Sequence, residues 1–353
     1  MAEPNSGIGN VTPNTGLVEM AMAYSRSRML CAAARLGVAD ALGDEVRSVG
    51  FLAEKCEADA SALYRLLRAL ASIGVTEETT PEHFRLTPFG KPLRKDVPQS
   101  VWSAVIFWAD LLADEWSLLT ECVRAGKPAR EVRDPTIPSR WSQDPEANSS
   151  IFRAVMGTAP AEDYAPIAEA WDFSRAKVVA DLGGGGGSLI LAVLGLNPRL
   201  RGMLVDLEPS IDAAKPRFAE EDPSSRCELI AADLTQSVPA GADVYMLKHV
   251  LHGRQDDVAI TILKNCHAVI PQDGSLLIVE FILPPLVSRA DPQLEGHLMS
   301  DLNMLAVTGG KERSEREWKA LLEAAGFILS GVYPVGGDKI MARNVGIVEA
   351  KPA

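Results

Sequence analysis

A glycine-rich turn in the middle of the chain restricts the fold more than any other segment. An apolar run at 178–180 ends in Asp181, five glycines occupy 183–187, and an apolar, helix-like stretch begins at Ser188. Glycine lets the backbone take left-handed dihedrals and approach a ligand closely, as in the nucleotide-binding corner of parallel α/β sheets. The turn therefore predicts a strand that enters a helix beside a ligand site.

From about residue 176 the sequence repeats this strand–helix rhythm. The predicted strands are 177–182, 203–206, 228–230, 244–247 and 275–281, and the helical stretches include 188–196, 211–219 and 258–269. Such alternation is typical of a mostly parallel, doubly wound sheet. We therefore predict an α/β domain over residues 166–353.

The residues before this domain are predicted to be mostly helical. Apolar residues recur at helical spacing from about 17 to 42, and two further helices are predicted from near Val49 and Ser61. Gly74 ends the last of these, and a hairpin is predicted over 75–87. Helices followed by a two-stranded ribbon predict a winged-helix-like module over 15–97. Residues 98–165 are predicted to form a helical linker, and residues 1–14, rich in Gly, Pro and Asn, to be disordered.

A winged-helix-like module raises the question of DNA binding, which the charge opposes. The net charge is −12, and the would-be recognition helix at 59–72 has only Arg65 and Arg68 as cations. DNA binding needs clustered Lys and Arg to displace counterions, and an anionic membrane attracts the same residues. We therefore expect no nucleic-acid or membrane partner. A small-molecule-sensing winged-helix regulator is kept as an alternative, and burial of an apolar helical face against a second copy is favoured.

The cysteines and the N-terminus predict a cytoplasmic location. Five cysteines are scattered without a CxxC pair, so neither a disulfide framework nor a metal site is predicted. The first residues lack the basic and apolar regions of a signal peptide, and no run of about 18 apolar residues occurs.

Acidic residues indicate which ligand the glycine turn would hold, because NAD, FAD and phosphate sites share such turns. Asp181 would repel a pyrophosphate and attract an ammonium group, and Asp206 ends the next predicted strand, where an acid can accept ribose hydroxyls. S-adenosylmethionine carries an ammonium, a sulfonium and a ribose but no phosphate, so it fits best. After the third strand, Asp233 could accept from the adenine amine while Leu234 packs on the ring. A dinucleotide, or a tight turn with incidental acids, is the alternative; Ser188 stands where the dinucleotide fingerprint has Gly or Ala.

Two histidines, His249 and His252, follow the fourth predicted strand at the sheet edge where ligands gather. Methyl transfer from a sulfonium is an in-line displacement and needs a nucleophilic acceptor. A phenol, with a pKa of about 10, is a poor nucleophile at neutral pH, and a histidine can take its proton. A single histidine at a strand end is more often structural. This pattern alone therefore leaves open whether the histidines are structural or take a proton from the acceptor.

The motifs around these histidines resemble those of the plant-type and bacterial small-molecule O-methyltransferases. The segments that carry the resemblance are Leu247-Lys248-His249-Val250-Leu251-His252 with Asp256-Asp257, and the stretches 277–284, 309–314, 34–42 and 63–74. It covers roughly residues 17–350. It implies a Rossmann-like class I methyltransferase domain that follows a winged-helix dimerisation domain, and a homodimer formed through that domain.

The resemblance also implies roles for individual residues. His252 would be the general base, with Glu280 and Glu312 flanking its imidazole. Glu280 lies in an apolar run, where a buried carboxylate needs a partner, whereas Glu312 lies in a charged stretch typical of a surface. The residues implied to hold the cofactor are Asp181, Gly183, Gly185, Asp206, Leu207, Asp233, Leu234 and Lys248. Those implied to line the acceptor pocket are Phe152, Met156, Asn303 and Met304.

We therefore expect a cytoplasmic, metal-free O-methyltransferase that converts S-adenosylmethionine to S-adenosylhomocysteine. Its acceptor would be a hydroxylated phenolic or heteroaromatic metabolite of antibiotic-type biosynthesis; polyketide, phenazine and simple phenolic acceptors are all compatible, and so is an amine. A relative that keeps the cofactor without methylating, for instance in a hydroxylation, is the alternative. The family typically has Asp-Trp after the catalytic histidine, and Gly253-Arg254 stands there instead, which puts the loop shape beside His252 in doubt.

Overall fold

The computed structural model describes residues 13–157, 159–222, 226–288, 294–336 and 345–353. The chain divides into two compact units, Met1–Asp114 with Ser139–Phe152, and Glu115–Pro138 with Arg153–Ala353. Residues 98–165 are divided between the two units. The disorder predicted for residues 1–12 lies outside the described residues, but it is wrong for Pro13 and Asn14, which begin the first helix.

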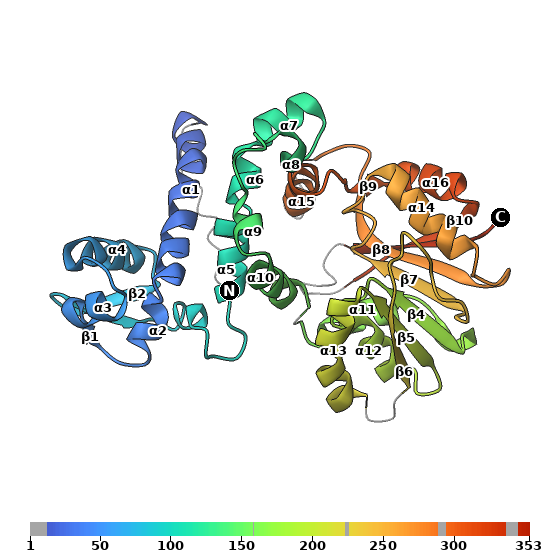
Figure 1. Ribbon diagram of the computed structural model, residues 1–353, viewed down its shortest axis with the longest axis horizontal. Coiled ribbons are helices and arrows are strands. Elements are labelled where there is room, and N and C mark those ends of the chain that lie inside the picture. The colour runs from blue at the N-terminus through green and yellow to red at the C-terminus, as the bar shows by residue number, and fades with distance from the viewer. Residues whose placement is uncertain (1–12, 158, 223–225, 289–293, 337–344) are drawn as a thin grey trace, which may run out of the picture. The chain divides into compact units, whose positions relative to one another are not determined.

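The first unit is mostly helical (Figure 1). Its elements are α1 (Pro13–Arg35), α2 (Val38–Leu42), β1 (Arg47–Ser48), α3 (Val49–Lys55), α4 (Ala60–Ser72), β2 (Thr76–Thr80), β3 (His83–Leu86), η1 (Lys91–Leu93), α5 (Trp102–Ile106), the π-helical turn η2 (Phe107–Leu111) and α9 (Arg140–Gln143); α6 (Ala113–Ser117) and α10 (Pro145–Gly157) cross the boundary between units. The single helical stretch predicted from 17 to 42 is interrupted because Gly37 is left-handed, with φ of 68°.

The winged-helix-like prediction holds for the order of α3, α4 and the hairpin, but the ribbon has three strands. β1 pairs with β3, which the two-stranded prediction missed because a two-residue strand leaves no alternating pattern. The side chain of Asp59 caps α4 by accepting from the amide of Ala62 at 2.8 Å. Buried Leu63, Leu67 and Leu70 form the inner face of that helix.

The second unit is a doubly wound sheet, and this confirms the predicted fold class. Its strands are β4 (Val178–Leu182), β5 (Arg201–Asp206), β6 (Cys227–Ala231), β7 (Val244–Lys248), β8 (Ser275–Leu283), β10 (Phe327–Pro334) and β11 (Val345–Pro352), in the order β10-β11-β8-β7-β4-β5-β6, with β9 (Arg313–Ser314) beside β8. The five strands from β6 to β8 are parallel, whereas β11 is antiparallel to both of its neighbours.

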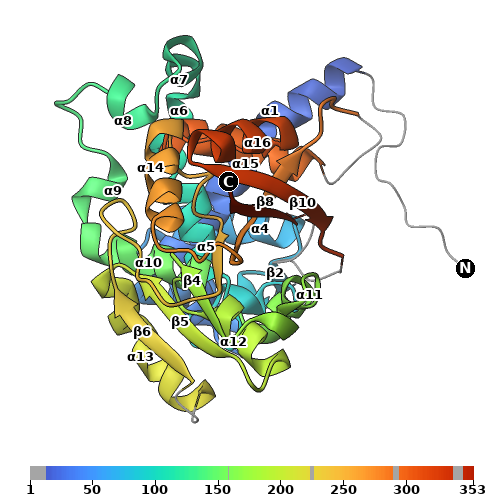
Figure 2. The same ribbon diagram turned by 90° about the vertical axis from the view of Figure 1, so that its right-hand side faces the viewer.

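Helices cover both faces of this sheet (Figures 1 and 2). One face packs on α11 (Ala165–Glu169), α12 (Ser188–Leu196) and α13 (Glu208–Glu221), and the other on α14 (Asp256–His267) and α16 (Glu315–Ala324). The remaining elements are α7 (Leu119–Ala125), α8 (Ala129–Val132), η3 (Ala161–Tyr164), η4 (Phe173–Arg175) and α15 (Leu294–Val307). Because the central strands are buried on both sides, they read as continuous apolar runs.

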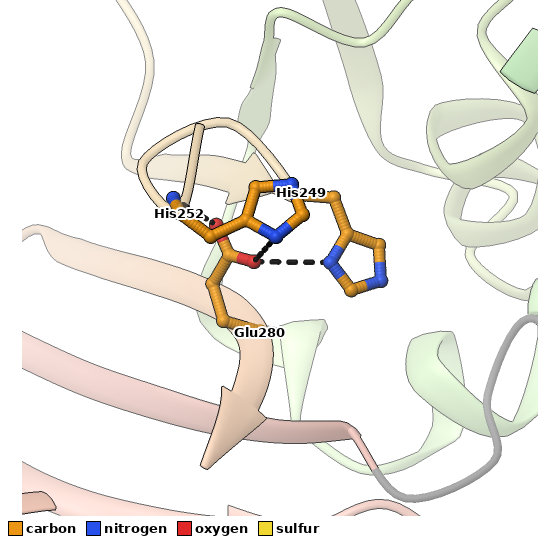
Figure 3. Close-up of side chains that lie close together, drawn as sticks. All are labelled: His249, His252 and Glu280. Carbon is orange, nitrogen blue, oxygen red and sulfur yellow. Dashed lines mark hydrogen bonds and ion pairs between the residues drawn. The ribbon is translucent and has the colours of Figure 1, made fainter. Parts of the chain in front are cut away.

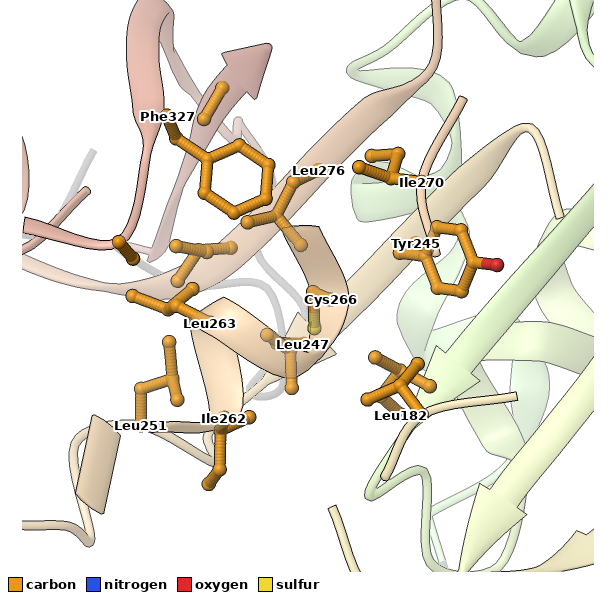
Figure 4. Packing of buried hydrophobic residues seen from close by; sticks show 14 of the residues in the cluster. Leu182, Tyr245, Leu247, Leu251, Ile262, Leu263, Cys266, Ile270, Leu276 and Phe327 are labelled. Carbon is orange, nitrogen blue, oxygen red and sulfur yellow. The ribbon is translucent and has the colours of Figure 1, made fainter. Parts of the chain in front are cut away.

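The core beneath α14 also holds the segment that follows β7 (Figure 4). Leu251 is fully buried in the same cluster as Leu247 of β7 and Ile262 and Leu263 of α14. Leu247 thus anchors the backbone before His249, and Leu251 anchors it between the two histidines. Within the described part of the chain, no helix is long and apolar enough to cross a membrane.

Candidate active site

Among the turn glycines Gly183, Gly184, Gly185 and Gly187, only Gly185 has open space where a Cβ would lie. Gly183 and Gly185 are left-handed, with φ of 69° and 55°. A Cβ at Gly183 would lie 2.7 Å from a methyl of Val250 and 3.8 Å from Leu234, whereas a Cβ at Gly185 would meet no protein atom within 4 Å. The open side of Gly185 is therefore the place where a ligand can approach the backbone.

Asp181 is a buried carboxylate whose oxygens form no hydrogen bond of good geometry, although the nearby amide of Ile190 favours its ionised form. It is 1% exposed, and neither side-chain oxygen has a partner among the described residues. Burial raises the pKa of Asp181 to about 7, against the attraction of Lys248, and burial lowers the pKa of Lys248 to about 8. An unpaired buried carboxylate costs free energy until a cation or donor reaches it. Its chemistry therefore fits the ammonium group of S-adenosylmethionine.

The other predicted cofactor residues follow the same edge of the sheet. Asp206 ends β5, and its carboxylate accepts from the amides of Gly185 at 2.8 Å and Leu207 at 2.7 Å, so it also holds the glycine turn. Leu207 is exposed, and Leu234 is buried next to Gly183. Asp233 is exposed, and hydrogen bonds from the hydroxyl and amide of the nearby threonine lower its pKa. Because β7, β4, β5 and β6 are parallel neighbours, their carboxyl ends bring these residues to one edge.

His252 is held by a carboxylate from a distant part of the chain. Its Nδ1 lies 2.8 Å from Oε1 of Glu312, and the Ser300 hydroxyl on α15 donates to the same oxygen at 2.7 Å. Asp301 accepts from the Glu312 amide at 2.9 Å. Glu312 is 2% exposed. An ionised carboxylate only accepts, so Nδ1 of His252 carries the proton and Nε2 keeps its lone pair.

Glu280, on β8, binds the segment that carries both histidines (Figure 3). Its Oε1 accepts from the amides of Val250, Leu251 and His252 at 3.0, 3.1 and 3.3 Å. Its Oε2 lies 3.0 Å from Nδ1 of His249 and 3.7 Å from Nδ1 of His252. Oε2 thus accepts a hydrogen bond from Nδ1 of His249, and the imidazole of His252 experiences Glu280 mainly as a neighbouring charge.

The two histidines differ in proton affinity. Burial by itself would lower the pKa of His252, but the charge of Glu280 and the hydrogen bond to Glu312 outweigh it and raise that pKa above its ordinary value. Burial and the nearby Lys248 lower the pKa of His249 to about 4, against its bond to Glu280. For Glu280, burial is outweighed by the two imidazoles, which lower its pKa to about 2. His252 is therefore the better proton acceptor.

The same cluster has donor atoms close enough together for a metal ion. One ligand atom from each of His249, His252 and Glu280 lies within 4.8 Å of the others. However, each Nδ1 already has a carboxylate oxygen at 2.8 or 3.0 Å. The three side chains are thus linked by hydrogen bonds, with Glu312 as a further partner of His252.

The predicted acceptor residues are distributed over both units. Asn303 and Met304 lie on α15, and buried Asn303 accepts at Oδ1 from the Trp116 indole at 3.0 Å. Met156 is exposed at 44%. Phe152 belongs to the first unit, where its ring packs against Phe107 and Trp141.

Arg313 was not recognised in the sequence because it lies in a run of charged residues. It is 1% exposed, donates to Asp256 at 2.7 Å, and also donates to the carbonyl oxygens of Leu251 and Arg254 at 3.0 and 3.1 Å. Arg313 therefore holds the loop after His252 in which Gly253-Arg254 stands. Ser300 and Trp116 were missed for a different reason: the residues that they bind are remote in sequence.

Comparisons with known proteins identify the family of the chain. Residues 116–328 match the family model of the O-methyltransferase domain, and residues 18–96 match that of the O-methyltransferase dimerisation domain. The chain is 36% identical to the phenazine O-methyltransferase PhzM of Lysobacter antibioticus, over 99% of both chains.

Two solved structures show the same likeness. The mitomycin 7-O-methyltransferase MmcR is 31% identical, with a TM-score of 0.84 and coverage of 96% of this chain and 98% of the other. The neocarzinostatin-pathway O-methyltransferase NcsB1, solved with S-adenosylmethionine and 2-hydroxy-5-methyl naphthoic acid, is 28% identical, with a TM-score of 0.77 and coverage of 98% and 100%. The chain therefore belongs to the O-methyltransferase family and is an S-adenosylmethionine-dependent O-methyltransferase of the natural-product type.

Proposed function

We propose that this enzyme methylates a hydroxyl of a small phenolic or heteroaromatic acceptor, with His252 as the general base. The observation that carries the proposal is the bond from Nδ1 of His252 to buried Glu312, because it leaves the lone pair of Nε2 free to take a proton. Glu280 supports the same role as a buried negative charge 3.7 Å from that Nδ1.

This geometry supports the following reaction. Bound S-adenosylmethionine supplies an electrophilic methyl group on a sulfonium. Nε2 of His252 would take the hydroxyl proton as the acceptor oxygen bonds to the methyl carbon, and S-adenosylhomocysteine would leave with the electrons of the carbon–sulfur bond. The imidazolium that forms on His252 is stabilised by Glu312 and Glu280. Positive charge thus disappears from the sulfonium and appears beside two carboxylates.

The cofactor would lie along the carboxyl edge of the sheet. Asp181 would attract its ammonium group, the open side of Gly185 would admit it, and Asp206 would accept from its ribose. Asp233 and Leu234 would contact the adenine. Gly183, Leu207 and Lys248 are the remaining residues proposed to bind the cofactor.

An aromatic acceptor is supported by what the relatives bind and by the predicted pocket residues. PhzM of Lysobacter antibioticus is a phenazine methyltransferase, and NcsB1 binds a hydroxynaphthoic acid. Asn303 offers a polar anchor, and its Oδ1 is fixed toward Trp116, so its amide nitrogen is the donor left for a ligand. Met304 and Met156, in the same unit as Asn303, would supply apolar surface, and Phe152 of the other unit is a separate predicted contact.

A second copy of the chain is the proposed partner. Residues 18–96 match a dimerisation domain, and α1 exposes large apolar side chains, namely Leu17, Val18, Met20, Met22 and Tyr24. Multi-angle light scattering of the intact chain should give twice the mass of one chain at micromolar concentration. A monomer mass at that concentration would remove the homodimer from the proposal.

The cytoplasm is the proposed location. All five cysteines are free, which suits its reducing conditions.

The function is tested by incubating the enzyme with S-adenosylmethionine and a panel of phenols, hydroxyphenazines and hydroxynaphthoates, with the matching aryl amines as a second arm. We expect at least one hydroxylated acceptor to gain 14 mass units with one equivalent of S-adenosylhomocysteine. Methylation confined to amines would overturn the acceptor class. Cofactor binding with hydroxylated but unmethylated products would favour the non-methylating alternative.

A further inference from the structure

We propose that His249 is a positioning residue for the reaction: it fixes the Glu280 carboxylate beside His252 and keeps that carboxylate from taking the proton-bearing nitrogen of the base. This inference rests on the proposed role of His252. Its evidence is a backbone conformation and a set of hydrogen bonds that converge on one buried side chain.

The backbone at His249 has an unusual conformation. Its φ is 52°, a left-handed value that residues with a side chain rarely take, although Asn, Asp and His take it more often than others. The amide of His249 still bonds to the Val279 carbonyl, at 3.2 Å, in the manner of β7. The next three amides then turn away and converge on Oε1 of Glu280. Successive amides around a left-handed residue form a concave anion site, and Glu280 occupies it.

The side chain of His249 occupies the other oxygen of Glu280. Because Glu280 is fully buried and ionised, it can only accept, so Nδ1 of His249 must be the donor in their 3.0 Å bond. Glu280 therefore receives four hydrogen bonds from one short segment. His249 thus contributes both the turn that aims three amides and the donor that fixes the remaining oxygen.

The consequence for His252 lies in a competition between two carboxylates. Oε2 of Glu280 is 3.7 Å from Nδ1 of His252, a distance that a small rotation would close, whereas Glu312 bonds to that nitrogen at 2.8 Å. With His249 in place, Oε2 has another donor and His252 keeps the orientation that Glu312 gives it. Without that donor, Glu280 would turn to His252 and bind its imidazolium directly.

Two substitutions separate the hydrogen bond from the backbone conformation. His249→Gly and His249→Asn both tolerate a left-handed φ, but only Asn has an amide nitrogen where Nδ1 lies. We expect His249→Gly to lower kcat about 10- to 50-fold with the Kd for S-adenosylmethionine changed less than about twofold. We expect His249→Asn to retain kcat within about threefold of the parent enzyme.

The pH profile distinguishes positioning from a general loss of structure. The charged and titratable groups that face His252 are Glu280 from β8, Glu312 from the segment before β9, Lys248 at the end of β7, and His249, which follows it. Since direct bonding to Glu280 favours imidazolium, His249→Gly should move the acidic limb of kcat/KM to higher pH by about 0.5–1 unit. His249→Asn should restore the parent profile.

The same shift should appear without turnover, in the NMR titration of the C2 proton of the His252 ring in each variant. An unmoved titration in His249→Gly, or equal losses of kcat in the Gly and Asn variants at similar melting temperature, would overturn the role of His249. If the proposed role of His252 itself is wrong, the result is different: the His252→Ala enzyme would then retain its turnover.

Discussion

Replacing His252 with alanine should lower kcat by about 10²–10⁴-fold, while the Kd for S-adenosylmethionine changes less than about twofold. The loss follows because no other described group near Glu312 and Glu280 is placed to take the proton: His249 commits its Nδ1 to Glu280 and has a pKa lowered to about 4 by burial and Lys248. Single-turnover rates with saturating cofactor, together with calorimetric binding, check both parts.

His83 supplies the control for that substitution. It is an exposed histidine on the β2–β3 hairpin of the other unit, so His83→Ala should leave kcat within about twofold. A His252→Ala enzyme whose kcat and cofactor affinity fall together by the same factor would point to a collapsed site and would count against general-base catalysis.

Gly185→Val should raise the Kd for S-adenosylmethionine by about 100-fold or more, equivalent to roughly 3 kcal/mol. Two effects combine at this position. The φ of 55° disfavours a β-branched side chain by about 1–2 kcal/mol, and the new side chain would enter the open space from which the ligand approaches. The amide of Gly185 is also the group that Asp206 holds, at 2.8 Å. Calorimetric titration with the cofactor measures the change.

Gly126 offers a matched comparison. It ends α7 with φ of 63°, and a Cβ at this position would also meet no protein atom within 4 Å, yet Gly126 is outside the glycine turn. Gly126→Val should lower the free energy of unfolding by about 1–2 kcal/mol and leave cofactor affinity unchanged within about twofold. If both valines weaken the cofactor equally, backbone strain alone explains the result and Gly185 does not face the ligand.

The central strands could be predicted from the sequence because burial on both faces leaves continuous apolar runs. β4, β7 and β8 agree with their predicted ranges to within two residues at each end. The strands β10 and β11, and the helices α15 and α16, were not predicted. β10 contains Gly331 and a register irregularity, and its exposure pattern is mixed, so its alternation is weak. Pairing between distant segments, which sets the place of β11 beside β8, has no local signature.

The site could be predicted only where chemistry is local in sequence. The glycine turn, Asp181 and Asp206 follow from strand ends and loop composition, and they remain predictions as cofactor contacts. Glu312 was assigned from family resemblance alone, since a charged stretch favours a surface position, and yet it is buried against His252. The role of Ser300 depends on a helix that had not been predicted. Side-chain partners that are 12 to 60 residues apart require the fold itself.

The position of β8 has a consequence for how the enzyme assembles. β8 carries Glu280, and its two principal sheet neighbours are β7, made before it, and β11, whose residues Val345–Ala350 are made more than 60 positions later. Until β11 emerges from the ribosome, one margin of the strand has unpaired backbone groups and apolar side chains that invite association with other nascent chains. The strand that holds the histidine segment in place therefore waits more than 60 residues for its second partner, so this region depends on rapid completion or on chaperone cover.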